Sequence, residues 1–143
     1  MRALLDINVI IALLDANHSL HHSARSWLAA HLMHGWASCP ITENGVIRIL
    51  SQPAYPNPQP HTLVVQRLQE AQQNADHAFW PDDISPTRHD AIQWKHVLGH
   101  RQLTDAYLLA LAVRHNGRLV TFDQRISLST VKGAEDRHLT VIQ

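Results

Sequence analysis

Residues 103–123 read LTDAYLLALAVRHNGRLVTFD, and this stretch decides the class of fold. Its first part, Leu103 to His115, is apolar almost all round when drawn as a helix, and such a helix must lie in the middle of a protein that folds in water. Asn116 and Gly117 are suited to end it. Arg118 to Phe122 follows as a strand, so a buried helix leads directly into a buried strand, as is typical of an α/β fold.

The rest of the chain continues this alternation. Helical spacing of apolar residues predicts helices over Leu20–Met33, Thr42–Leu50, Thr62–Gln73 and Pro86–Val97. Short apolar runs predict further strands at Leu4–Leu5, Trp36–Cys39, Ala78–Trp80 and Leu139–Ile142. This order predicts a central parallel sheet of about five short strands flanked by helices, a three-layer α/β sandwich. With no internal repeat and no second core, residues 1–143 are expected to form a single domain.

Composition indicates an intracellular protein without marked charge. Twelve Lys and Arg residues balance twelve Asp and Glu residues, so any attraction for nucleic-acid phosphate must be local or supplied by a bound cation. Cys39 has no partner for a disulfide, which indicates a reducing compartment, and we expect it to be a small buried residue. The apolar run Ala3–Leu14 is too short for a bilayer and contains Asp6, so we expect a cytoplasmic protein without a membrane segment.

Two further features do not by themselves indicate a site. The chain has twelve histidines, and several of them are close together: His18, His21, His22, His31 and His34. Without an HExxH pattern or a cysteine partner, we interpret them as solvated helix surface rather than as a metal site. The prolines between Pro53 and Pro60 predict an ordered surface loop, and a contact of this loop with a substrate stays open.

Four acidic residues fall at equivalent places in the predicted pattern: Asp6, Glu43, Asp105 and Asp123. Asp6 and Asp123 each end a strand. Glu43 and Asp105 each open a helix, directly after a threonine. In an open parallel sheet, the carboxyl ends of the strands and the N-termini of the following helices share one edge, where ligands bind. The four carboxylates are therefore expected to lie together at this edge.

A plain structural explanation exists for some of these residues taken singly. Thr42 and Thr104 are competent N-caps, and a carboxylate in the first turn stabilises a helix by about 0.3–1 kcal/mol. For Glu43 alone this explanation is as good as a functional one. The whole set is harder to explain, because two carboxylates about 5 Å apart repel each other by roughly 3 kcal/mol at an effective dielectric constant of about 20. Such a group must hold protons or recruit a cation, and oxygen ligands favour Mg²⁺ or Mn²⁺. A hydrated ion of this kind can activate a water and bind phosphate, so the expected chemistry is phosphodiester hydrolysis.

The motifs around the four acids resemble those of a known family. They read Leu-Leu-Asp6-Ile-Asn8, Thr42-Glu43, Leu-Thr-Asp105-Ala-Tyr and Leu-Val-Thr121-Phe-Asp123. In order and spacing they resemble the PIN-domain family, and most of all the VapC-type toxins of bacterial type II toxin–antitoxin pairs. The resemblance covers essentially the whole chain, and the ordered set is far more specific than any one motif.

This resemblance implies a PIN-like fold and a Mg²⁺-dependent endoribonuclease, in which Mn²⁺ would substitute. Such toxins inhibit translation by cleaving tRNA, rRNA or mRNA. The implied partners are the RNA substrate, a cognate VapB-like antitoxin whose C-terminal segment lies over the acidic site, and a second copy of the chain in a homodimer. Operator DNA would be bound only through the antitoxin, and no membrane is involved.

Carried over to this chain, the resemblance assigns roles to individual residues. Asp6 and Asp105 would be the principal metal ligands. Glu43 and Asp123 would complete the catalytic acidic pocket and bind the metal directly or through water. Neighbouring polar residues would support them: Asn8, Thr104 and Thr121.

Three other interpretations compete with a ribonuclease. A haloacid-dehalogenase-type phosphatase needs a second aspartate where this chain has Asn8. A receiver-like Mg²⁺-binding signalling module needs a lysine near the end of the last strands, and Lys132 does not end a strand. A non-catalytic RNA-binding PIN-like domain would keep the fold without needing the acidic set. Three arginines are candidates to contact RNA phosphate, although a plain surface position is the more ordinary interpretation of each: Arg48, Arg101 and Arg125.

Overall fold

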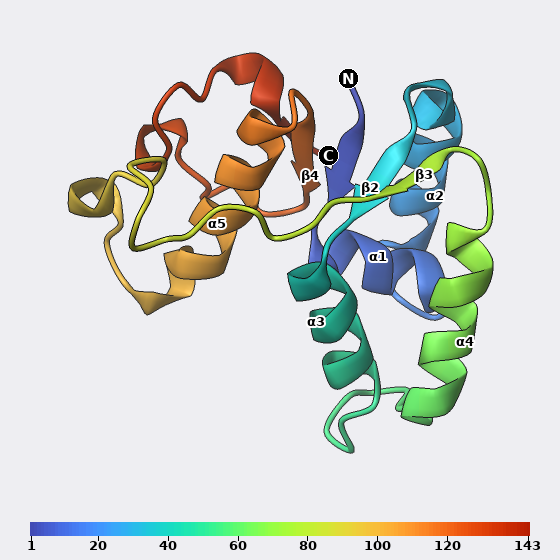
Figure 1. The fold of residues 1–143 in the computed structure, drawn as a ribbon. Coiled ribbons are helices and arrows are strands. Elements are labelled where there is room, and N and C mark those ends of the chain that lie inside the picture. Colours follow the sequence, from blue (N-terminus) through green and yellow to red (C-terminus); the bar gives the residue numbers. More distant parts are fainter.

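The computed structural model describes all residues, 1–143, and contains one sheet of five parallel strands (Figure 1). The strands lie in the order β3-β2-β1-β4-β5. Their bounds are Ala3–Leu5 for β1, Trp36–Ser38 for β2, His77–Phe79 for β3, Arg118–Thr121 for β4 and Leu139–Val141 for β5. The predicted parallel sheet is confirmed, and every predicted strand lies within one residue of its expected bounds.

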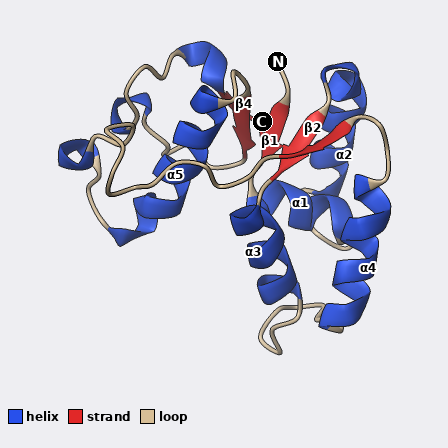
Figure 2. Cartoon of the chain, viewed as in Figure 1, coloured by secondary structure: helices blue, strands red, loops and turns tan.

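Helices cover both faces of this sheet (Figure 2). The α-helices are α1 (Ile7–Leu14), α2 (His21–His31), α3 (Pro40–Leu50), α4 (His61–Gln72) and α5 (Leu103–Arg114). Short 3-10 turns are found at Leu32–His34, Trp94–His96, His100–Gln102, Leu128–Thr130 and Asp136–His138. Helices α1 to α4 pack on one face and α5 packs on the other (Figure 1). This arrangement confirms the predicted three-layer α/β sandwich.

The alternation of side chains along each strand divides the core between the two faces. Leu4 and Leu119 pack with the buried residues of α5. Leu5 and Val120, each one residue further along, pack with α1 to α4. Successive side chains of a strand point to opposite faces, so a strand covered on both sides is apolar throughout. The central strand β1, Ala3–Leu5, is accordingly an unbroken and fully buried apolar run.

Helix α5 is buried as its sequence predicts. All of its side chains from Ala106 to Ala112 are buried. The helix turns into β4 through Asn116, which has a φ of 54°, and Gly117. A Cβ atom at Gly117 would lie 2.6 Å from the carbonyl oxygen of Arg2. The close approach of the two chain segments therefore requires glycine there.

We expect Leu109→Ala to lower the free energy of unfolding by about 2–5 kcal/mol, because Leu109 is fully buried and truncation leaves a cavity. Chemical denaturation in urea measures the change. Leu103→Ala is the matched control, since Leu103 lies in the same helix but is 43% exposed. Equal losses in the two variants would contradict the central position of α5.

One predicted helix is absent. Residues 86–97 contain no α-helix, only a short 3-10 turn near their end. Their backbone pairs instead with a distant segment: the amide of Gln93 donates to the carbonyl of Thr130 at 2.9 Å, and Ile92 lies opposite Val131 in an antiparallel bridge. The prediction was wrong because it rested on local spacing and an initial proline, whereas these non-local contacts determine the conformation.

The predicted N-caps of two helices are corrected, and α3 also begins earlier than predicted, whereas α5 begins where it was predicted. Helix α3 begins at Pro40 with Cys39 as its N-cap, and α5 begins at Leu103. Proline suits the first helical position because its missing N–H would have no partner there. Thr42 and Thr104 therefore lie inside the first turns. The Thr42 hydroxyl still serves the helix start, since it accepts a hydrogen bond from the amide of Cys39 at 3.0 Å.

The clustered histidines serve local structure. Nδ1 of His21 lies 2.7 Å from the carbonyl oxygen of Ala12, and the ring of His31 stacks on Trp27 with centroids 4.1 Å apart. No histidine belongs to a group of side chains placed to hold a metal ion.

Two smaller expectations, on the proline-rich loop and on Cys39, are met as well. The loop Pro53–Pro60 joins the ends of α3 and α4 that lie farthest from the sheet (Figure 1). Cys39 is free and buried, as predicted. None of the helices combines the length and the hydropathy needed to span a membrane.

Candidate active site

Three of the four predicted acids meet at the carboxyl edge of the sheet, beside the neighbouring strands β1 and β4. The chain leaves β1 into α1 on one face, whereas it enters β4 from α5 on the other face. Ligands of open parallel sheets bind at such a point, where the connections diverge. Asp6 follows β1 directly, Asp123 lies two residues after β4, and Asp105 lies in the first turn of α5.

Asp6 is the most rigidly held of the acids. Its side chain is the N-cap of α1 and accepts a hydrogen bond from the amide of Ile7 at 2.8 Å through Oδ1. The Thr121 hydroxyl donates to Oδ2 at 2.7 Å. The residue is only 5% exposed, and burial raises the pKa of Asp6 although both hydrogen bonds oppose the rise. A buried carboxylate fixed through both oxygens can change its orientation very little.

Thr121 links the first and last acidic motifs. It is fully buried at the end of β4, where its hydroxyl donates to Asp6 and accepts from the amide of Asp123 at 3.0 Å. One side chain thus orients a carboxylate of β1 and the backbone that carries another. This position agrees with the supporting place that the sequence motif predicts for Thr121.

Asp105 faces the other acids without a compensating donor. Burial, and after it the negative charges of Asp6 and Asp123, raise the pKa of Asp105 to about 6. No protein group donates a hydrogen bond to its carboxylate, and the opposing influence of Arg125 is the smallest of the four. The carboxylate of Asp105 therefore has no hydrogen-bond donor, and Arg125 offsets only part of the effect of burial and of the neighbouring negative charges.

Asp123 is paired with an arginine of the same loop. Nε of Arg125 donates to Oδ1 at 3.1 Å, and the amide of Arg125 donates to the same oxygen at 2.9 Å. The hydrogen bonds from Arg125 hold the pKa of Asp123 below its usual range. Asp123 is therefore oriented by a positively charged partner, whereas Asp105 accepts no hydrogen bond.

Glu43 lies in an adjoining polar cluster. Its Oε2 accepts hydrogen bonds from the Ser38 hydroxyl at 2.6 Å and from the Gln72 amide at 3.0 Å. Since the Ser38 proton points to Glu43, the Ser38 oxygen accepts from Nε2 of His77 at 2.8 Å. The charge of Glu43 acts to raise the pKa values of His77 and Asp82. The pKa of Asp105 responds instead to the charges of Asp6, Asp123 and Arg125. The expected single pocket of four acids is thus divided into a group of three and the neighbouring Glu43.

The group of three, Asp6, Asp105 and Asp123, fits a hard cation by its chemistry. All of its donor atoms are carboxylate oxygens, and burial followed by their mutual repulsion raises the pKa of Asp105. The side chains are not drawn together into a metal-ligand arrangement, since no group of three or more His, Cys, Asp or Glu residues is so placed. The contact with Arg125 keeps Asp123 turned toward that arginine.

A pocket of about 300 Å³ opens beside Asp105 and Asp123. Its walls come from residues 98–102, which precede α5, and from residues 125–130, which follow β4. Arg101 and Arg125 both line it. The pocket thus combines two of the acids with positively charged side chains.

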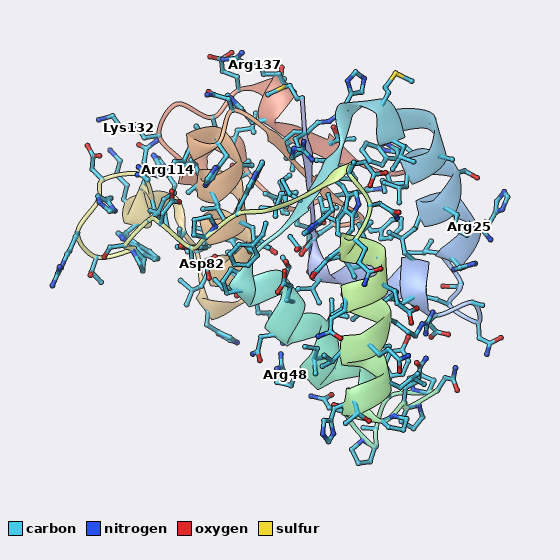
Figure 3. All side chains as sticks on the ribbon, turned by 45° about the vertical axis from the view of Figure 1, so that its right-hand side comes forward. Arg25, Arg48, Asp82, Arg114, Lys132 and Arg137 are labelled. Atoms are coloured by element: carbon cyan, nitrogen blue, oxygen red, sulfur yellow. The ribbon has the colours of Figure 1, made fainter.

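Other predicted residues lie apart from these contacts. Asn8 and Thr104 are exposed, and their side chains make no hydrogen bond within the protein. Arg48 is exposed on α3 and does not line the pocket (Figure 3).

Several polar residues near Glu43 escape a sequence-based prediction: Ser38, Gln72, His77 and Asp82. Ser38 is the last residue of β2, two residues before the start of α3, the helix that contains Glu43, and this position is the only signal that could have singled it out. Gln72 and His77 come from the end of α4 and from β3, and nothing in their local sequence connects them to Glu43.

The α/β fold and the three aspartates at the carboxyl edge of its sheet together define the class of protein. The chain belongs to the PIN domain family, whose model matches residues 3–131.

Its relatives include ribonucleases of Mycobacterium tuberculosis (strain ATCC 25618 / H37Rv). Ribonuclease VapC44 is 46% identical over 142 residues, which is 99% of this chain and 100% of the relative. Ribonuclease VapC39 is 40% identical over 134 residues, which is 93% of this chain and 96% of the relative. Ribonuclease VapC29 is 38% identical over 127 residues, which is 89% of this chain and 90% of the relative. The predicted resemblance to VapC proteins of this family is confirmed.

A receiver-like module loses its support in the structure. Lys132 pairs with Asp90 at 2.8 Å in an exposed ion pair, and Figure 3 shows it at the outer side of the molecule, away from Arg48 on α3. It is not available to the acids at the end of β1.

Proposed function

We propose that this chain is a divalent-metal-dependent endoribonuclease and the toxin of a VapBC-type toxin–antitoxin pair. The observation that carries the proposal is the group Asp6, Asp105 and Asp123 at the carboxyl edge, in which Asp105 lacks any donor and has a pKa raised to about 6. The identity of 46% to Ribonuclease VapC44 over nearly the whole chain supports RNA as the substrate.

In this proposal Asp6 and Asp105 are the principal ligands of Mg²⁺, for which Mn²⁺ substitutes. Asp123 and Glu43 complete the site, directly or through water. The cation supplies a water of lowered pKa and neutralises charge that develops on the phosphate.

The chain's own residues prepare this site. Thr121 and the amide of Ile7 hold Asp6 in place before substrate arrives, so little ordering is left to do. Asp105 must be ionised, which happens above a pH of about 6. Ser38 and Gln72 hold the carboxylate of Glu43.

The partners follow from the same proposal. The substrate is tRNA, rRNA or mRNA, whose cleavage inhibits translation, and the place of action is therefore the cytoplasm. A VapB-like antitoxin covers the site, and the toxin contacts operator DNA only through that antitoxin. Residues 1–143 form a single nuclease domain, and two copies form a homodimer.

A cleavage assay tests the proposal. Purified protein free of antitoxin is incubated with total tRNA and rRNA in Mg²⁺, in Mn²⁺ or in EDTA, beside Asp105→Ala. We expect discrete fragments with 5′-phosphate and 3′-hydroxyl ends, formed only with metal and only by the unchanged chain. Fragments that form in EDTA and end in 2′,3′-cyclic phosphate would overturn the metal-dependent mechanism. No cleavage of any RNA would count against the ribonuclease itself.

We expect Ser38→Ala to lower the cleavage rate by about 10–100-fold, because outer partners of a ligand typically have effects of this size. The variant removes the donor to Glu43 and the acceptor of His77, while leaving all four acids in place. Initial rates at saturating Mg²⁺ measure the effect. Ser51→Ala, at the far end of α3, removes a hydroxyl bonded only to backbone and should leave the rate unchanged. A rate for Ser38→Ala equal to that of Ser51→Ala would exclude a role for this contact.

A further inference from the structure

We propose that the pocket between residues 98–102 and 125–130 binds one unpaired nucleotide of the RNA, with Arg125 on its phosphate and Leu98 against its base. This inference rests on the proposed ribonuclease function and names the form of RNA that the site accepts.

The place and size of the pocket carry the first step. Asp105 and Asp123 lie in its wall, so a nucleotide held there is next to the acidic group. The volume of about 300 Å³ is at the lower end of small-ligand sites, and it has room for a single nucleotide rather than for a duplex. Proteins that recognise RNA by its bases mostly take unpaired nucleotides, whose bases are free to leave the stack.

The charges around the pocket carry the second step. Arg101, Arg125 and His100 line it, although the chain as a whole has no net charge. Two arginines and a histidine at one mouth give the local attraction for phosphate that the overall composition lacks. Arg48 is an exposed arginine on α3 outside this group, so it offers a matched comparison.

Arg125 is already oriented for an anion. Its Nε is held by Asp123 Oδ1 at 3.1 Å, and Nη2 lies 3.5 Å from Oδ2. The side chain is nevertheless 81% exposed, and a guanidinium has five N–H donors, so several donors still face solvent. An arginine held in this way loses less side-chain freedom when it binds phosphate than a free one does.

The apolar part of the wall carries the last step. Leu98 is 85% exposed, and packing within the fold does not account for it. Its amide is held by the Gln102 side chain at 2.7 Å, which fixes the backbone at the pocket mouth. Ile126 lines the same pocket, and the Ser127 hydroxyl lies there too. Apolar surface beside a hydroxyl suits the face and the edge of an unstacked base.

Binding without cleavage tests the inference. All variants are made in an Asp105→Asn chain in EDTA, and the probes are a fluorescein-labelled 12-nucleotide single strand of mixed sequence and a blunt 12-base-pair RNA duplex. We expect Arg125→Ala to weaken single-strand binding about tenfold and to reduce the slope of log affinity against log salt by about 0.7, the value for one phosphate contact on a single strand. The affinity of Arg125→Lys for the single strand should lie between those of the Arg125 and Arg125→Ala chains, since lysine keeps the positive charge but lacks the paired N–H donors of a guanidinium. Arg48→Ala should have less than a twofold effect.

Leu98→Ala separates base binding from phosphate attraction. It should weaken binding of the single strand several-fold and leave duplex binding and the salt slope unchanged, with Leu63→Ala as the control at another exposed leucine. Equal effects of Arg125→Ala and Arg48→Ala, or equal loss of both probes in Leu98→Ala, would overturn the subsite. If the unchanged chain still cleaves RNA with Mg²⁺, that result leaves the ribonuclease standing. Failure of the metal-free chain to bind either probe would overturn the subsite alone, whereas the ribonuclease is removed only if the unchanged chain also fails to cleave RNA with Mg²⁺.

Discussion

The Asp105→Asn variant is expected to lose RNA cleavage by about a thousandfold or more and yet, in EDTA at pH 7.5, to be more stable than the unchanged chain. The loss of activity follows because a bound cation supplies several kcal/mol of stabilisation to the transition state, and each 1.36 kcal/mol is a tenfold change in rate. The gain in stability follows because the ionised carboxylate faces Asp6 and Asp123 without any donor.

The sign of the stability effect can be worked out from the pKa of Asp105. Its folded value of about 6 exceeds its ordinary value of 3.8, so the folded state holds the proton more tightly than the unfolded state. The resulting stability is complete below pH 3.8 and is lost as the pH rises through about 6. For a fully buried group, a pKa shift of this size would change the free energy of unfolding by about 3 kcal/mol. Because Asp105 is only half-buried, we expect a change of about 1–2 kcal/mol.

Urea unfolding at several pH values measures this difference between the two proteins. It should be greatest above pH 7 and should vanish near pH 3.5. Asp90→Asn is the matched control, because Asp90 is exposed and paired with Lys132. That variant should cleave normally and gain no stability. An Asp105→Asn chain less stable than the unchanged one at pH 7.5 would contradict the acidic group described above.

The Asp6→Asn variant is expected to lose cleavage to a similar extent, by about a hundredfold to a thousandfold, but to lose stability as well. Removing the buried charge of Asp6, whose pKa burial raises, relieves part of its desolvation, but we expect the loss of hydrogen bonds to outweigh this relief. The Asp6 carboxylate accepts from both the Ile7 amide and the Thr121 hydroxyl, whereas an asparagine has a single acceptor oxygen. One buried donor is left without its partner, at a cost of about 1–3 kcal/mol. The two aspartate variants thus resemble each other in activity and differ in the sign of their effect on stability.

The same variant should lower the pKa of Asp105. The charge of Asp6 is the second cause of the raised value, after burial, so its removal brings the pKa down while burial keeps it above 3.8. Carbon-detected NMR of the aspartate carboxyl groups follows the titration directly. An Asp105 pKa that stays at about 6 in Asp6→Asn would mean that the two carboxylates do not interact.

Much of the fold could be predicted because its signals are local. The apolar sequence from Ala106 to Ala112 is sufficient to place α5 in the core, and each short strand contains apolar residues that mark its place in the sequence. Helix α1 was not predicted, because its residues Ile7–Leu14 continue the apolar run of β1 and few polar residues separate the two elements. The segment 86–97 misleads for the opposite reason: its helical spacing is overruled by backbone pairing around Ile92 and Val131.

In the candidate site, too, some positions could be predicted from the sequence and others could not. Asp6 and Asp123 end neighbouring strands, so topology alone brings them to one edge. Glu43 also lies in the first turn of a helix at that edge, but its orientation depends on Ser38 and on Gln72 from another helix. Contacts of this kind depend on packing between elements that are distant in sequence, and no local pattern reports them.

The central claim is that the acids at the ends of β1 and β4 and at the start of α5 bind a divalent cation. Titration of the purified chain with Mn²⁺ at pH 7.5, followed by the electron paramagnetic resonance signal of free Mn²⁺, tests it without any RNA. We expect saturable binding that weakens by about tenfold or more in Asp105→Asn and in Asp6→Asn, and that is unchanged in Asp90→Asn. Binding that is equal in all four proteins would contradict the claim, because the cation would then be held somewhere else.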